Sequence, residues 1–206
     1  MDEPLRIGVL ASGRGSNLQA VLDATARPGF PARVALVVSD RERAQALERA
    51  ARAGVPARFI SPKDFGDREA YDAAVSAALD TAGVELVCLA GYMRIVGVAF
   101  VRRWSGRLMN IHPSLLPAFP GLHPQRQALD HGVKVAGATV HFVDEGVDTG
   151  PIILQASVPV LDADTEESLS ERILVEEHRL YPEAIRLFAE RRLRVSGRRV
   201  ILEARG

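Results

Sequence analysis

Residues 5–24, LRIGVLASGRGSNLQAVLDA, decide the fold class because they join two different structural patterns through a glycine-rich loop. Residues 5–12 form a short apolar run, which is typical of a buried strand, and residues 16–25 have the pattern of a helix. A strand that leads into a helix through such a loop is the first half of a βαβ unit. This segment therefore predicts an α/β protein with a parallel sheet.

The rest of the chain continues the same alternation and then departs from it. Further strands are predicted at residues 33–40, 56–60, 84–91 and 107–110, and further helices at residues 42–53, 68–80 and 97–103. Residues 133–144 and 151–160 read as the two arms of a long hairpin, a long helix begins at Asp164 or Thr165, and a small hairpin turns at residues 196–197. We expect one domain over residues 1–206, with a mostly parallel twisted sheet, a Rossmann-like N-terminal half and a partly antiparallel C-terminal part.

Composition limits the classes of partner. The 206 residues include 26 basic and 26 acidic side chains, so the formal net charge is zero and no basic footprint for nucleic acid or an anionic membrane is present. No apolar run reaches the roughly 18 residues of a membrane span. Cys88 is the single cysteine and lies in an apolar run, which favours a packing role and a reducing compartment. We expect a cytoplasmic protein that binds small molecules.

The loop after the first strand could hold a phosphate. A dinucleotide fingerprint needs a third glycine three residues after Gly15, but Leu18 occupies that position. Gly15, Ser16 and Asn17 still offer backbone, hydroxyl and amide donors at a helix N-terminus, which suits one phosphate monoester. The alternative is that these residues only form a glycine turn that starts the helix.

A second candidate site lies in LMNIHPSLLPAFPG, residues 108–121. Ligands of open α/β sheets bind beyond the carboxyl ends of the strands, which is where Asn110 and His112 fall. An amide and an imidazole there could stabilise an oxyanion, and a carboxylate could complete proton transfer. Asp148 is the candidate, and its charge is expected to raise the pKa of His112, while Asp144 and Glu145 compete for the same role. Alternatively, Asn110 and His112 only form a turn and a strand end.

Two other chemistries are disfavoured. The histidines at 112, 123, 131 and 141 form no closely spaced pair, so we assign no metal. Ser114 lies between Pro113 and Leu115 and lacks the strand-to-helix elbow of a nucleophilic serine.

Six motifs, in order and at matching spacings, give the chain a resemblance to the glycinamide ribonucleotide formyltransferases, the folate-dependent enzymes of de novo purine biosynthesis. They are SGRGSNLQA, DREAYD, LAGYMRI, GRLMNIHPSLLP, GVDTGPIILQA and EEHRLYP. The resemblance implies that Asn110, His112 and Asp148 are catalytic, and that Glu177 lies at the ribose and phosphate end of the substrate. It also implies that Gly15, Ser16 and Asn17 hold the substrate phosphate. It places Arg68 near the glutamate tail of the folate. It also implies that two segments form the walls of the pterin pocket. The first segment is Met93, Arg94, Ile95 and Val96, and the second is the loop 143–148, with Val143, Asp144, Glu145 and Val147.

The resemblance also implies the ligands. The formyl group passes directly from 10-formyltetrahydrofolate to the primary amine of glycinamide ribonucleotide, without a metal or a covalent enzyme intermediate. No nucleic acid or membrane partner is implied, and a homodimer is compatible with the pattern. Three positions depart from relatives: Ala118 stands where Lys is frequent, Gln125 where a second His is frequent, and Leu174 where some carry a polar or basic residue.

Three other functions compete. Methionyl-tRNA formyltransferase and formyltetrahydrofolate deformylase share the SLLP motif, but we expect the first to need an added RNA-binding domain and the second an added regulatory domain. A regulatory module that only binds nucleotides through the GRGSN loop would show binding without turnover.

Overall fold

The computed structural model describes residues 3–204, which form two compact units that meet in sequence at Met109 and Asn110. Within the described residues, no helix is both long enough and apolar enough to cross a membrane.

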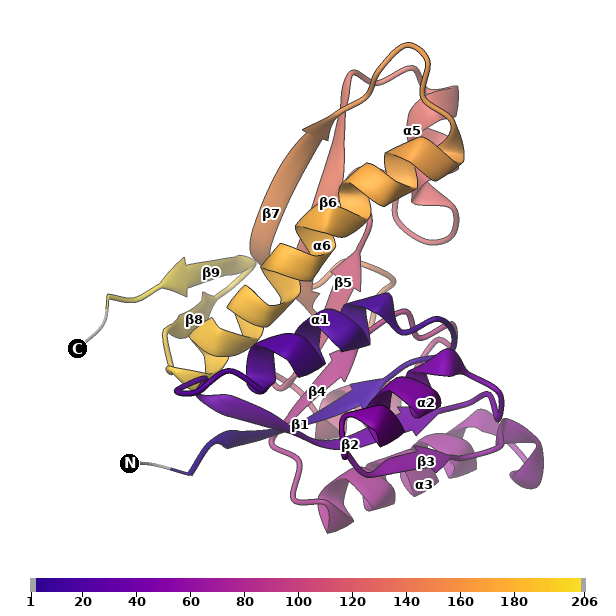
Figure 1. Cartoon of the computed structure of the whole chain (residues 1–206), viewed down its shortest axis with the longest axis vertical. Helices are drawn as coiled ribbons and strands as arrows, with labels where there is room; N and C mark the ends of the chain where they lie inside the picture. Colours follow the sequence, from indigo (N-terminus) through magenta and orange to yellow (C-terminus); the bar gives the residue numbers. More distant parts are fainter. Residues whose placement is uncertain (1–2, 205–206) are drawn as a thin grey trace. The chain divides into compact units, whose positions relative to one another are not determined.

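The N-terminal unit is a parallel α/β layer. Its strands β3, β2, β1 and β4 lie in that order, and the pairings of β1 with β2 and β4 and of β2 with β3 are parallel. The helices α1 and α2 lie on one side of these strands and α3 on the other (Figure 1). The elements in chain order are β1 (Leu5–Leu10), α1 (Ser16–Thr25), β2 (Ala32–Ser39), α2 (Gln45–Arg52), β3 (Ala57–Phe59), the 3-10 helix η1 (Pro62–Asp64), α3 (Arg68–Thr81), β4 (Leu86–Leu89) and α4 (Val98–Arg103).

Two local expectations in this unit need correction. The helix predicted at residues 42–53 begins only at Gln45, because Ala44 is extended and the Ser39 hydroxyl holds a turn by accepting from the Arg41 N–H. The short η1 helix was not predicted, since three residues are too few to show a period. Cys88 is fully buried in β4, as its apolar surroundings predict.

The second unit begins at Asn110, within β5 (Leu108–His112). β6 and β7 form the predicted antiparallel hairpin, β9 pairs with β7 in parallel, and β8 pairs with β9 antiparallel. The long helix α6 packs along β6 and β7, as Figure 1 shows. The remaining elements are α5 (Pro124–Asp130), β6 (Val135–Phe142), β7 (Ile152–Pro159), α6 (Glu166–Ala189), β8 (Leu193–Ser196) and β9 (Arg199–Leu202).

The start of α6 settles an alternative that the sequence left open. Thr165 is the N-cap: its hydroxyl accepts from the Ser168 N–H, and the Ser168 hydroxyl accepts from the Thr165 N–H. Leu169, Ile173 and Ile185 of α6 are buried. The seven-residue helix α5 was not predicted, because it is too short to show a helical period between its flanking turns.

The predicted α/β class is therefore confirmed, with parallel strands in the N-terminal unit and an antiparallel hairpin in the C-terminal one. The C-terminal hairpin presents one loop, residues 143–151, at the end where β6 passes into β7.

Candidate active site

The polar residues of the candidate active site come from three segments of the C-terminal unit. Asn110 and His112 lie within β5, because the strand continues to His112 and does not end at residue 110 as expected. His141 lies on β6, and Asp148 lies in the loop between β6 and β7. The loop returns closely on itself, since a Cβ atom at Gly150 would collide with the carbonyl oxygen of Phe142. A glycine at 150 is therefore required for the tight loop that presents Asp148.

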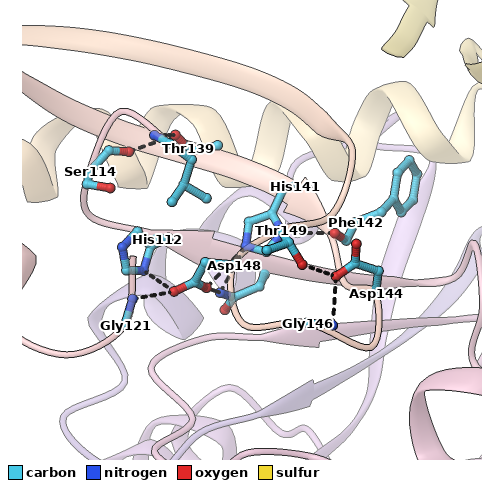
Figure 2. A network of polar contacts seen from close by, with 12 residues as sticks. His112, Ser114, Gly121, Thr139, His141, Phe142, Asp144, Gly146, Asp148 and Thr149 are labelled. Carbon is cyan, nitrogen blue, oxygen red and sulfur yellow. Dashed lines mark hydrogen bonds and ion pairs between the residues drawn. The ribbon is translucent and has the colours of Figure 1, made fainter. Parts of the chain in front are cut away.

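Asp148 is the centre of this group (Figure 2). Its Oδ2 lies 3.4 Å from Nδ1 of His112 and accepts a 2.8 Å hydrogen bond from the Gly121 N–H. Its Oδ1 lies 3.6 Å from Nε2 of His141 and 3.5 Å from Nδ2 of Asn110. The side chains of His112 and Asp148 are only 6% and 11% exposed. The carboxylate therefore contacts both imidazoles with little water to screen it.

The hydrogen bonds of the two imidazoles assign their protons. Nε2 of His112 lies 2.9 Å from the carbonyl oxygen of Phe119, and Nδ1 of His141 lies 2.8 Å from that of Phe142. A carbonyl oxygen only accepts, so each of these nitrogens carries a hydrogen. In a neutral His112 the nitrogen without a hydrogen is Nδ1, which faces Asp148. Nε2 of His141 lies 3.2 Å from Nδ2 of Asn110.

Burial decides the pKa of His112. Burial, the largest influence, lowers the pKa of His112 and outweighs the raising effects of the Phe119 carbonyl and the Asp148 charge. The expected net increase in this pKa is wrong for that reason, although the carboxylate acts in the predicted direction. For Asp148, burial would raise the pKa, but the His141 imidazole, the Gly121 N–H and the His112 imidazole together lower it. At rest near neutral pH, the pair is a carboxylate beside a neutral imidazole.

The loop contains two further carboxylates, and the structure separates their surroundings. Oδ1 of Asp144 accepts from the Gly146 N–H at 3.1 Å and from the Thr149 hydroxyl at 2.6 Å, which ties this side chain into its own loop. Glu145 is exposed. The carboxylate placed against His112 is Asp148, as predicted, and its catalytic role stays a prediction.

The sequence reasoning missed a group of polar side chains, the clamp of Thr139 and Gln155, that holds the segment after His112. The Thr139 hydroxyl donates to the Ser114 carbonyl at 2.7 Å and accepts from the Leu116 N–H at 3.1 Å. Gln155 donates to the Thr139 hydroxyl and to the Leu116 carbonyl, each at 2.9 Å. The signal was available: side chains two apart on a strand share a face, so Thr139 and His141 point the same way. The clamp fixes the segment that follows His112.

A pocket of about 340 Å³ opens beside the carboxylate. It is lined by Asp148 and by Leu116, Pro117, Pro120, Val147, Thr149, Gly150, Ile152 and Arg198. Within the described residues, no group of three or more His, Cys, Asp or Glu side chains could hold a metal ion.

A buried carboxylate–imidazole pair with an adjacent amide suits proton transfer and oxyanion stabilisation. Comparison with known proteins shows the family to which the chain belongs. The formyl transferase family model matches residues 5–185. The phosphoribosylglycinamide formyltransferase of Mycobacterium tuberculosis H37Rv is 51% identical over 195 residues, which cover 95% of this chain and 90% of that protein. The chain belongs to the phosphoribosylglycinamide formyltransferase family.

Other similar proteins support the same family assignment. The crystal structure of glycinamide ribonucleotide transformylase 1 from Symbiobacterium toebii is 60% identical, with a TM-score of 0.97 over 99% of this chain and 96% of that one. The trifunctional purine biosynthetic protein adenosine-3 of Drosophila pseudoobscura pseudoobscura is 56% identical over 191 residues, or 92% of this chain. The chain spans only 14% of the length of that relative.

The loop that the resemblance gives to the substrate phosphate has a left-handed glycine before α1. Gly15 precedes α1 with a φ of 68°, and a Cβ atom there would collide with Ala46 of α2. Ser16 and Asn17 are the first two residues of α1, so their N–H groups lie in its first turn. Packing against α2 alone is enough to require this glycine, so its presence does not distinguish a phosphate site from a simple turn.

The segment that the resemblance gives to the pterin pocket is held from within the N-terminal unit. The Met93 N–H donates to the Ser12 hydroxyl at 2.8 Å, and the Arg94 guanidinium lies 4.9 Å from the centre of the Tyr71 ring. Met93 and Ile95 are 64% and 67% exposed, which leaves apolar surface for a ligand.

The other residues taken from the resemblance have differing surroundings. Glu177 is buried on α6, and Arg68 is the exposed first residue of α3. Val96 and Val143 are half-buried, and Val147 is exposed in the pocket wall. Gln125 lies in the first turn of α5, a helix that was not expected there.

Proposed function

We propose that the chain transfers the formyl group of 10-formyltetrahydrofolate to the primary amine of glycinamide ribonucleotide. The observation that carries this proposal is the contact between Asp148 and Nδ1 of a neutral His112, with Asn110 beside them, in a member of this family. The donor and the residue roles are part of the proposal.

In the proposed reaction, the amine nitrogen attacks the formyl carbon, and the carbonyl oxygen becomes an oxyanion. Asn110 supplies an N–H to that oxygen. His112 was expected to stabilise the oxyanion as well, but its Nε2 hydrogen is directed to the Phe119 carbonyl, so we assign it instead to take up a proton at Nδ1 as positive charge develops on the attacking nitrogen. Asp148 stabilises the resulting imidazolium. The new carbon–nitrogen bond remains, the bond from the formyl carbon to N10 of the folate breaks, and N10 receives the proton.

We infer the binding roles from the same resemblance. Gly15, Ser16 and Asn17 bind the phosphate, and Glu177 binds the ribose and phosphate end. The exposed apolar side chains of Met93, Ile95 and Val147 support the proposal that the segments 93–96 and 143–148 form the pterin walls. Arg68 attracts the glutamate tail of the folate, and no metal takes part. The zero net charge and the buried Cys88 support a cytoplasmic location.

The decisive experiment is to incubate the purified protein with both proposed substrates and to follow the release of tetrahydrofolate. We expect release that depends on the acceptor and is much slower when the acceptor is dephosphorylated. Binding of the acceptor without release would support the nucleotide-binding module instead. Hydrolysis of the donor without acceptor would indicate a deformylase.

A further inference from the structure

Thr149 directly follows Asp148 and is held on two sides. Its hydroxyl donates a 2.6 Å hydrogen bond to Oδ1 of Asp144, so that the loop is closed from 144 to 149 (Figure 2). Its carbonyl oxygen accepts a 3.0 Å hydrogen bond from Nη2 of Arg198, which lies in the turn between β8 and β9. Both bonds act on the residue next to the carboxylate that contacts His112.

The loop has little room in which to relax around Thr149. A Cβ atom at Gly146 would meet the Thr149 side chain, and one at Gly150 would collide with the Phe142 carbonyl. Oδ1 of Asp144 also accepts from the Gly146 N–H, so one carboxylate oxygen links Asp144 to both Gly146 and Thr149. The hydroxyl of Thr149 is thus an integral part of the loop closure.

Asp148 itself has a backbone that needs such support. Its φ is 55°, in the left-handed region that residues other than glycine seldom occupy. A residue in this region keeps that conformation only when its surroundings impose it. The side chain of Asp148 reaches His112 and the Gly121 N–H from this backbone position.

We propose that Thr149 is a positioning residue, whose hydroxyl bond to Asp144 holds the Asp148 carboxylate against His112. Asp144 then serves the site through Thr149, in addition to the role in the pterin wall that the resemblance gives it. The catalytic meaning of this positioning rests on the proposed function, whereas the positioning itself is a property of the loop. The titratable groups that face His112 are the imidazole of His141 and the carboxylate of Asp148.

The test compares two substitutions at one position. Thr149→Val keeps the branched shape and removes the hydroxyl, and Thr149→Ser keeps the hydroxyl. We expect Thr149→Val to lower kcat by about threefold to tenfold, because one hydrogen bond that supports the transition state is lost. The acceptor KM should change little. Thr149→Ser should restore most of the loss. Thr81→Val, which removes an exposed hydroxyl bond to the Ala77 carbonyl in α3, is the matched control and should leave kcat unchanged.

The second readout needs no substrate. An Asp148 side chain that moves away from His112 raises the imidazole pKa less, so the His112 pKa should be lower in Thr149→Val than in the wild type, by NMR titration. It should return to the wild-type value in Thr149→Ser. Melting curves ensure that every variant is folded during the assays, and Thr149→Ala replaces Thr149→Val if the latter does not fold.

The outcomes separate the two proposals. An unchanged His112 titration in the hydroxyl-free variant, or a Thr149→Ser variant as impaired as Thr149→Val, overturns the positioning role. A shifted titration in a protein whose wild type transfers no formyl group supports the positioning of Asp148 and overturns the proposed function.

Discussion

Replacing Asp148 by Asn should keep the fold and both ligands but remove most of the activity. The amide has the shape of the carboxylate and its oxygen can still accept from the Gly121 N–H, so the loop should be retained. What is lost is a negative charge 3.4 Å from Nδ1 of His112. The effect on the reaction can be bounded from this distance.

A full charge at this separation interacts with an imidazolium by about 5 kcal/mol at an effective dielectric constant of about 20. A change of about 1.4 kcal/mol in the activation free energy changes the rate tenfold. Complete loss of this interaction would therefore lower kcat by between about a thousandfold and ten thousandfold. The amide dipole retains part of the attraction. We therefore expect kcat to fall by about a hundredfold to a thousandfold, with small changes in both KM values.

The titration of His112 should respond as well. Asp148 is one of the groups that raise the His112 pKa against the stronger lowering effect of burial. Without its charge, burial acts with less opposition, so the pKa of His112 should fall further below its ordinary value in Asp148→Asn. NMR titration of the imidazole in the two proteins measures this difference directly.

Asp130→Asn is the control, since it neutralises an exposed carboxylate at the end of α5 that, within the described residues, bonds only Arg126. We expect this variant to retain most of its activity. An identical His112 titration in the wild type and in Asp148→Asn would refute the charge argument. Loss of activity in Asp144→Asn instead would show that the wrong carboxylate of the loop had been chosen.

Four further outcomes are expected. Asn110→Ala and His112→Ala should each lower kcat by about a hundredfold or more, and near-normal turnover in either folded variant would remove the role of that residue. Joint replacement of Ser16 and Asn17 by Ala should raise the acceptor KM far more than the donor KM, whereas equal effects would indicate only a helix start. Because burial puts the His112 pKa below its unfolded value of about 6.5, the unfolded state binds the proton more readily, and stability is lost as pH falls below that value. The melting temperature of His112→Ala should therefore fall less between about pH 7 and pH 5 than that of the wild type, and parallel curves would contradict this. Gly137→Ala should lower the free energy of unfolding by about 1–3 kcal/mol, because the new Cβ atom on β6 would collide with the Ala156 carbonyl on β7. Chemical denaturation measures this loss, and an unchanged midpoint would contradict the close approach of the two strands.

Much of the fold could be predicted because its signals are local. The helix at residues 16–25 and the hairpin of β6 and β7 follow from apolar period and glycine placement, and both are confirmed. The pairing of His112 with Asp148 across 35 intervening residues was also predicted, from the chemistry that a lone imidazole at a strand end requires. These inferences needed no knowledge of which atoms touch.

The parts that failed depend on atoms brought together from distant segments. The sign of the His112 pKa shift depends on how completely its ring is buried, and burial is a property of the packed chain. The Phe119 carbonyl and the Gly121 N–H are backbone groups, which every sequence contains and no side-chain pattern marks.

The sequence by itself determined the α/β class, the family, and the residue types available at the site. Only the tertiary structure decided which carboxylate of the loop 143–151 faces His112, which nitrogen of that ring is free, and that Thr149 ties Asp144 to the residue after Asp148. The physical reason is the distance over which each kind of interaction acts. Strand and helix patterns arise from neighbours along the chain, whereas charge, burial and hydrogen-bond direction act over a few ångströms of space and are fixed only when the chain has packed.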